Sequence, residues 1–205
     1  REDILEIVEM LASLKRSKWI GIVTRSRKLK KLARSLKERG LSSITISIDT
    51  GNPEVHIIEG LSSCRECGFE DITINTVVTT SNMNEIPHLI NLASKFNAKL
   101  KLIDLMDVKI GLEEQSRDYW RLHYVSLQSP VIREYLEKRA KEIYLELPYG
   151  CMGTPMLTFK LINGVKVLLR DATIGTWYSP SYCSKCKFYP CQDALISLRL
   201  CHDGC

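Results

Sequence analysis

Cysteines are concentrated near the C-terminal end of the chain, with a spacing that could hold a metal ion or an iron–sulfur cluster. Five of the eight cysteines lie after residue 182. Cys183 and Cys186 are separated by two residues, which lets both thiolates face one ion, and further cysteines follow them. Thiolates spaced in this way are typical of chelating sites rather than of packing in a core. We therefore predict four metal or cluster ligands: Cys183, Cys186, Cys191 and Cys201.

Two other roles for these cysteines are a disulfide framework and a set of free thiols. Disulfide frameworks are typical of small secreted domains, whereas this chain has 205 residues and no segment that reads as a signal peptide. We favour ligation of a metal ion or cluster by these cysteines. Their spacing alone does not distinguish a zinc ion from an iron–sulfur cluster. Cys151 and Cys205 have no assigned role.

Composition and charge indicate an ordinary globular chain. The formal net charge is +5, and much of it comes from the basic segment Arg25 to Arg39. This segment favours an anionic partner such as a nucleotide, although for the segment by itself a solvated helix face is the better explanation. Nucleic acid is not favoured as a partner. Because no apolar run is long enough to span a bilayer, we expect no membrane contact and a cytoplasmic location.

The first half of the chain alternates between helical and strand patterns. Apolar periodicity predicts helices at residues 3–14, 28–39, 57–67 and 84–96, and strands at 19–24, 44–49, 72–78 and 100–105. Such alternation predicts an α/β fold with parallel strands joined by helical crossovers. In these folds the functional site gathers at the carboxyl ends of the strands, which here carry Ser47, Asn75 and Met106 among others.

The character of the sequence changes at about residue 111. A helix is predicted from Pro130 to Lys141, and Asn163-Gly164 between two apolar runs is a strong hairpin signal. A last strand, 195–200, falls inside the cysteine-rich region. We therefore predict two domains, residues 1–110 with the parallel strands and residues 111–205 as an antiparallel, cysteine-rich extension.

Several motifs occur in the order found in one known family. The segment Ser43 to Asp49 is similar to a strand ending in Ser-Leu-Asp, and Ile74 to Val78 to an Asn-x-Val-Val stretch. Lys101 to Val108 resembles Phe-Ile-Glu-Leu-Met, and Tyr182 to Cys186 resembles Phe-Cys-x-x-Cys. Together they resemble the GTP 3',8-cyclases, the radical S-adenosylmethionine (radical SAM) lyases that begin molybdenum cofactor, or molybdopterin, biosynthesis.

This resemblance implies a fold, a chemistry and a set of site residues. The fold would be a partial (β/α) barrel of parallel strands, and the full-length family member would hold two [4Fe-4S] clusters and S-adenosylmethionine. Ser47 and Met106 would bind S-adenosylmethionine, and Arg199 would contact the nucleotide. The first cluster, held with S-adenosylmethionine by the barrel, would pass an electron from a reductant to S-adenosylmethionine, and the resulting 5'-deoxyadenosyl radical would abstract hydrogen from a GTP-like substrate. The second cluster, in the C-terminal region, would contact that substrate. A homodimer is one oligomeric state compatible with the family.

The chain also departs from the family pattern. It has no Cys-x-x-x-Cys-x-x-Cys loop, so an enzyme is expected on the condition that this loop precedes residue 1. Cys64 and Cys67 do not replace the loop, since they form a single pair at a predicted helix end. The crossover between Asp49 and Gly68 is shorter than in the family. This suggests a seam near residues 55–57, that is, a point where residues of a longer crossover are missing from the sequence.

The substrate side differs as well. Val23 stands where the family has Thr, and Thr73 where it has Lys, so cationic contacts to a triphosphate are lost. Cys191 is an additional cysteine, and its thiolate could occupy the coordination site of the cluster that the family leaves open for substrate. Two alternatives therefore remain: a radical SAM enzyme acting on a substrate other than GTP, and a non-catalytic, zinc-stabilised binding protein.

Overall fold

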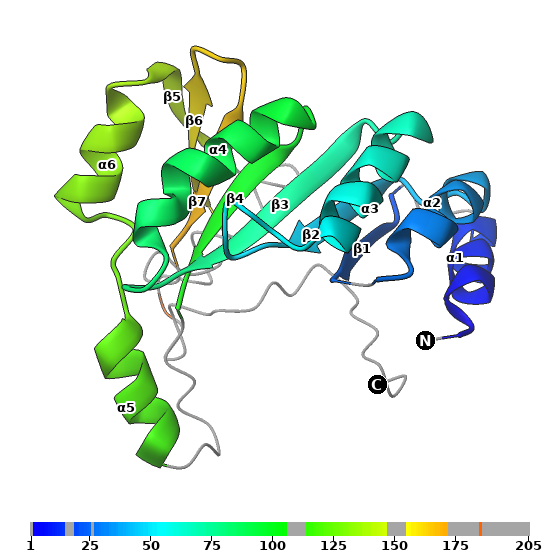
Figure 1. Ribbon diagram of the computed structural model, residues 1–205, viewed down its shortest axis with the longest axis horizontal. Coiled ribbons are helices and arrows are strands. Elements are labelled where there is room, and N and C mark those ends of the chain that lie inside the picture. The colour runs from blue at the N-terminus through cyan, green and yellow to red at the C-terminus, as the bar shows by residue number, and fades with distance from the viewer. Residues whose placement is uncertain are drawn as a thin grey trace. The chain divides into compact units, whose positions relative to one another are not determined.

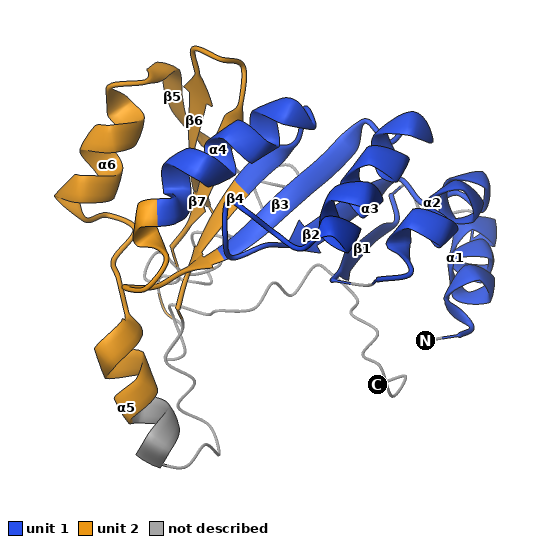
Figure 2. Cartoon of the chain, in the orientation of Figure 1, with its two compact units in different colours: residues 1–76, 85–100 blue, residues 77–84, 101–205 orange. Residues whose placement is uncertain are grey.

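The computed structural model describes residues 2–14, 19–25, 27–105, 114–146, 155–171 and 185, with the side chains of residues 114–117 excepted. The chain divides into two compact units (Figure 2). Unit 1 comprises Arg1–Thr76 and Glu85–Leu100, and unit 2 comprises Val77–Asn84 and Lys101–Cys205. The strands form one seven-stranded sheet in the order β1-β2-β3-β4-β7-β6-β5 (Figure 1).

Unit 1 is built from alternating helices and strands, as the sequence predicts. Its helices and strands are α1 Ile4–Ser13, β1 Gly21–Thr24, α2 Leu29–Glu38, β2 Ser43–Ser47, α3 Val55–Glu66, β3 Asp71–Val78, the short 3-10 helix η1 Met83–Glu85, α4 Ile86–Lys95 and β4 Lys99–Asp104. The boundaries of β3, η1 and β4 run into unit 2. β1 pairs with β2 and β2 with β3, both in parallel. The α/β fold with parallel strands is therefore confirmed.

The core of unit 1 lies on one face of these strands. Every second side chain of β3 is buried, as are Ile44 and Ile46 of β2, and Ile44, Ile46 and Ile74 are fully inaccessible to solvent. Helices α2, α3 and α4 lie on one side of the strands (Figure 1). They bring apolar stripes to this face because their buried residues recur at helical spacing: Leu29, Ala33 and Leu36 in α2, Ile57, Leu61 and Cys64 in α3, and Leu89, Ile90 and Ala93 in α4.

The short crossover after β2 forms a complete helix. Because α3 runs without interruption from Val55 to Glu66, the suspected seam at residues 55–57 falls within its first turn. A parallel crossover needs about a dozen residues, and this segment supplies them. The shorter crossover therefore still joins β2 to β3 in the way that a parallel pair requires.

Unit 2 contains helices α5 Glu114–His123 and α6 Pro130–Glu137 and strands β5 Ala140–Glu146, β6 Met156–Leu161 and β7 Lys166–Arg170. β6 pairs with β5 and with β7, in both cases antiparallel. The turn at Asn163-Gly164 joins β6 to β7, and Gly164 has φ +86°, a left-handed conformation that glycine adopts without strain. The predicted hairpin is therefore confirmed.

Two predictions for unit 2 need correction. The predicted helix from Pro130 to Lys141 ends at Glu137, because the chain turns there and enters β5. The charged aromatic stretch before it forms α5, for which no helix was predicted. The predicted domain boundary at residue 110, the strand at 195–200 and the cysteine-rich extension lie outside the described residues and remain predictions. None of the helices in the described ranges has the length and apolar character needed to cross a membrane.

Candidate functional site

The face of the parallel strands opposite the helices is polar. Register places Val23, Thr45 and Thr73 side by side, and Ser47 beside Asn75. Paired residues of neighbouring strands point to the same face, so the four polar side chains form a continuous patch. We call Thr45, Ser47, Thr73 and Asn75 the polar floor. All four are partly exposed, whereas parallel sheets usually have both faces covered by apolar packing.

The carboxyl end of the polar floor has an unpartnered hydrogen-bond acceptor. Asn75 Oδ1 is buried and has no hydrogen-bond partner among the residues that the structure describes. A buried carbonyl oxygen without a donor costs about 1–3 kcal/mol, so such atoms are rare unless a ligand or water satisfies them. Ser47, its register partner, adds a hydroxyl at the same end of the sheet. This pair is therefore the part of the floor best suited to bind a ligand.

Backbone bonds just beyond Ser47 fix its position. The amide of Ile48 donates to the carbonyl oxygen of Asn75 at 2.9 Å. The hydroxyl of Thr76 donates to the carbonyl oxygen of Ile48 at 2.6 Å. Since both peptide groups of Ile48 are held by β3, the ends of β2 and β3 are held in register where Ser47 and Asn75 lie.

Ion pairs lie at both ends of the polar floor. At the carboxyl end, Arg25 Nη1 lies 3.2 Å from Asp49 Oδ2. At the other end, Lys99 Nζ lies 2.7 Å from Asp71 Oδ1, and both side chains are about one-third exposed. These pairs cancel charge at the edges, so the floor itself offers hydroxyl and amide groups.

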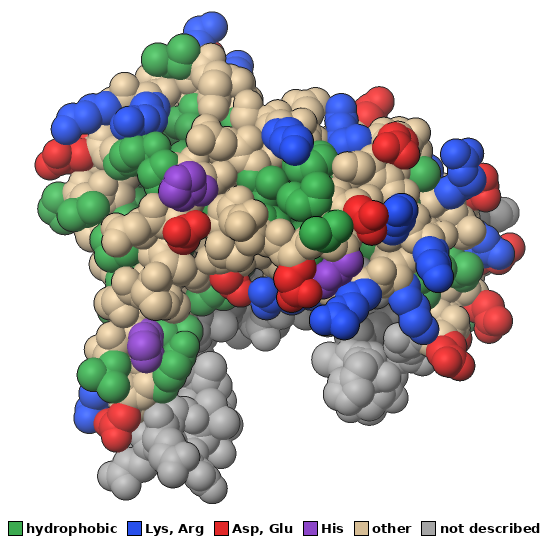
Figure 3. Space-filling model, in the orientation of Figure 1, with side chains coloured by type: hydrophobic (Ala, Val, Ile, Leu, Met, Phe, Trp, Pro, Cys, Tyr) green, Lys and Arg blue, Asp and Glu red, His purple; other side chains and the backbone are tan. Residues whose placement is uncertain are grey.

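Several side chains of the basic segment form ion pairs within unit 1. Arg27 pairs with Glu54, Lys30 with Glu59 and Arg39 with Glu9, at 3.6, 2.9 and 3.4 Å. Acidic and basic side chains are interspersed on the surface that carries α2 and α3 (Figure 3). This arrangement fits a solvated helix face, which the sequence left open beside an anionic partner.

The cysteines of α3 do not form a cluster site. Cys64 is buried, and Cys67 is the residue at which α3 ends. Burial, and to a smaller extent the neighbouring Cys67, raises the pKa of the Cys64 thiol to about 12. A thiol held protonated in this way is a packing group, as the sequence predicted. No group of three or more His, Cys, Asp and Glu side chains suited to a metal occurs in the described ranges.

This environment predicts that Cys64 resists alkylation. At pH 8, iodoacetamide is expected to leave Cys64 unmodified in the native protein and to modify it after unfolding in urea, because only the thiolate reacts. Peptide mass spectrometry distinguishes the two states. The raised pKa stabilises the fold below about pH 9, and this contribution is lost as the pH rises toward 12. Rapid modification of Cys64 in the native state would contradict this assignment.

The other predicted site residues fall outside the described residues: Met106, Arg199, Cys183, Cys186, Cys191 and Cys201. Of these, Met106 follows closely after β4, whose last residue Asp104 is buried. Nearby in unit 2, the indole nitrogen of Trp120 donates to the carbonyl oxygen of Leu105 at 2.8 Å. Burial raises the pKa of Tyr124, and the negative charges of Asp104 and Asp171 contribute to the same shift.

Comparison with known proteins places these features in context. No family model matches the chain. It is 28% identical over 141 residues to a GTP 3',8-cyclase of Limosilactobacillus fermentum, covering 63% of this chain and 41% of that protein. It is 27% identical over 154 residues to a probable GTP 3',8-cyclase of Methanocaldococcus jannaschii, covering 70% and 48%.

A longer match is found in Methanosarcina acetivorans. There a probable GTP 3',8-cyclase is 28% identical over 227 residues, covering 97% of this chain and 61% of that protein. The chain thus spans about half the length of the curated relatives it matches. The resemblance inferred from the motifs is confirmed, because these matches carry the same name and the longest of them covers 97% of this chain. The chain is thus similar to the GTP 3',8-cyclases, at 27–28% identity to these three proteins.

Proposed function

We propose that the chain forms part of a radical SAM enzyme of the GTP 3',8-cyclase type, which acts on a nucleotide. In this proposal residues 1–110 contribute to a partial (β/α) barrel, and residues 111–205 form the extension that carries a [4Fe-4S] cluster. The single observation that carries the proposal is the partly exposed polar floor on parallel strands, with Ser47 and Asn75 at its carboxyl end. Parallel α/β enzymes bind their ligands at this position.

The residues of the floor fit S-adenosylmethionine. This molecule presents amino and hydroxyl groups that can donate to Asn75 Oδ1, the buried acceptor without a partner. The Ser47 hydroxyl can donate and accept at the same end of the floor. When it is bound and reduced through an iron–sulfur cluster, S-adenosylmethionine supplies hydrogen-atom abstraction. Met106 would complete the binding site beyond β4.

In this proposal the residues of this chain bind the cofactor and the substrate and hold them in position. The bonds from β3 to Ile48 keep Ser47 and Asn75 at a fixed spacing, so little reorganisation is needed when a ligand binds. The apolar layer beneath the floor excludes water from one side of the site. Cys183, Cys186, Cys191 and Cys201 would hold the cluster, and Arg199 would contact the nucleotide.

A substrate other than GTP is a second candidate, and one observation favours it. Thr73 lies on the floor where the related enzymes are expected to present a lysine, and the nearby Lys99 is paired with Asp71. A threonine hydroxyl binds a triphosphate less strongly than an ammonium group does. The floor therefore suits the neutral part of a nucleotide better than its phosphates.

Two measurements on anaerobically purified protein test the proposal. Iron and sulfide are expected, together with a brown colour, whereas stoichiometric zinc in a colourless protein would favour the non-catalytic alternative. With a reductant and S-adenosylmethionine, 5'-deoxyadenosine is expected to form faster when GTP is added. Formation that does not respond to GTP would favour another substrate, and no formation by a protein that carries the Cys-x-x-x-Cys-x-x-Cys loop before residue 1 and holds both clusters would contradict the proposed chemistry.

A further inference from the structure

The loop that follows β2 is fastened to the start of α4. Immediately after Ser47 and Ile48, the backbone amide of Gly51 donates to Glu85 Oε2 at 3.0 Å. The hydroxyl of Thr50 lies 3.5 Å from the same oxygen and accepts the amide of Asn52 at 3.3 Å. Both segments belong to unit 1. A single carboxylate oxygen thus binds two consecutive residues of this loop.

Glu85 occupies the position at which a side chain usually caps the first turn of its own helix. It is the N-cap of α4, yet its side chain makes no hydrogen bond to the first turn of that helix. Pro87 in the first turn lacks an amide hydrogen, so one of the usual capping donors is absent. The carboxylate still benefits from the positive end of the helix dipole. Glu85 is therefore available to hold the neighbouring loop.

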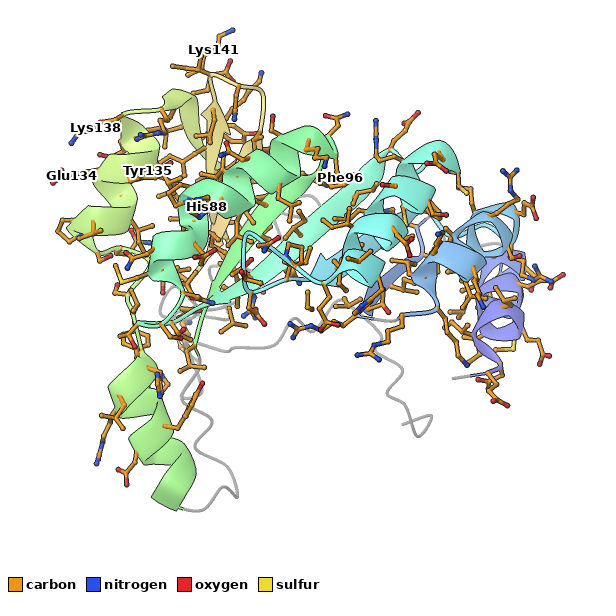
Figure 4. The ribbon with its side chains drawn as sticks, in the orientation of Figure 1. His88, Phe96, Glu134, Tyr135, Lys138 and Lys141 are labelled. Atoms are coloured by element: carbon orange, nitrogen blue, oxygen red, sulfur yellow. The ribbon has the colours of Figure 1, made fainter. Side chains whose placement is uncertain are left out.

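The loop can approach Glu85 only because residue 51 is glycine. A Cβ atom at Gly51 would lie 2.0 Å from the Cβ atom of His88, far inside van der Waals contact. His88 lies in the first turn of α4 (Figure 4), and its Nδ1 atom is 3.6 Å from Glu85 Oε2. The glycine, the histidine and the carboxylate thus form one close contact between the loop and α4.

Resting on the function proposed above, we infer that Glu85 is a positioning residue for the S-adenosylmethionine site. It acts by holding Thr50 and Gly51, and so fixes the exit of β2 just beyond Ser47. Three consecutive parts of this exit are anchored to three different elements: Ile48 to β3, Asp49 to Arg25 after β1, and Thr50–Gly51 to α4. Without Glu85, the third anchor is lost and the loop can move away from the polar floor.

The experiment compares Glu85→Ala, Glu85→Gln and the control Glu59→Ala, which breaks the surface pair with Lys30. Equilibrium dialysis of S-adenosylmethionine against anaerobically purified protein gives the affinity. We expect Glu85→Ala to weaken binding about tenfold, because the loop is no longer pre-organised beside the polar floor and must be ordered when the ligand binds. Glu85→Gln retains an acceptor oxygen and is expected to stay within about threefold of the wild type. The control is expected to bind normally.

Hydrogen exchange of residues 49–54 gives a readout that does not depend on the ligand. Faster exchange of this loop is expected in Glu85→Ala, while the rest of unit 1 keeps the exchange rates of the wild type. Unchanged exchange and unchanged affinity would overturn the inference. If Glu85→Ala does not fold, Glu85→Asp, which retains the charge but is too short to reach Gly51, is measured in its place against the same expectations. If wild-type protein fails to bind S-adenosylmethionine while exchange responds as expected, the proposed function fails and the fastening of the loop stands.

Discussion

Replacing Asn75 by leucine is expected to weaken S-adenosylmethionine binding by about ten- to a hundredfold. The substitution preserves volume but removes the buried acceptor Oδ1, to which the ligand is proposed to donate. Losing such a bond, and leaving the ligand's donor unsatisfied, costs about 1.5–3 kcal/mol. Isothermal titration calorimetry under anaerobic conditions measures the affinity directly. Stability should rise slightly or stay unchanged, since an unsatisfied polar atom is removed from the fold.

Thr73→Val is the matched control for this prediction. Thr73 lies on the same strand and the same face as Asn75, two residues further from the carboxyl end. If S-adenosylmethionine binds at the carboxyl end, this variant is expected to keep its affinity within about threefold. Equal weakening by both variants would mean that the whole floor is disturbed, and no effect of Asn75→Leu would remove the main support for the binding site.

Changing Cys183 and Cys186 together to serine is expected to remove the C-terminal cluster. Two hydroxyl groups in place of two thiolates leave too few soft ligands to hold iron and sulfide. Iron content, sulfide content and the visible absorption spectrum of anaerobically purified protein measure the loss. Formation of a product from the nucleotide should fall at least a hundredfold, because the cluster is proposed to lie at the substrate.

Single variants of the other cysteines define this site further. Cys151→Ser is the control, since no role is assigned to this residue, and it should retain all the iron. Cys191→Ser and Cys201→Ser each test one proposed ligand, and loss of iron in one alone would identify which of them binds. If the double variant keeps its iron, the cysteine-rich region is not the cluster site.

Much of unit 1 could be predicted from the sequence because its signals are local. The stripe Leu29, Ala33 and Leu36 predicted α2, and the buried alternation around Ile44 and Ile46 predicted β2. Alternation of these elements then determined that the strands run parallel. The strand ends, including Ser47 and Asn75, followed from that topology. Local patterns therefore predicted both the fold of unit 1 and the edge of the sheet where the candidate site lies.

Other features depend on contacts between distant residues and leave little trace in the sequence. The contact of Glu85 with Gly51 joins residues 34 positions apart, and nothing in either segment indicates the other. The floor position of Thr45 depends on register, which a local pattern does not specify in advance. The predicted helix extends to Lys141, two residues into β5, because Ala140 and Lys141 are compatible with either structure. Most of the residues proposed to hold cofactors lie outside the described ranges.

The turn at Gly164 has a kinetic consequence. Strands β6 and β7 are adjacent in sequence, so they can pair within microseconds of the start of folding. By contrast, β1, β2 and β3 are separated by whole helices, and each parallel pairing requires a larger loop to close first. The hairpin is therefore expected to form early, and the polar floor is expected to be assembled among the last parts of the native structure.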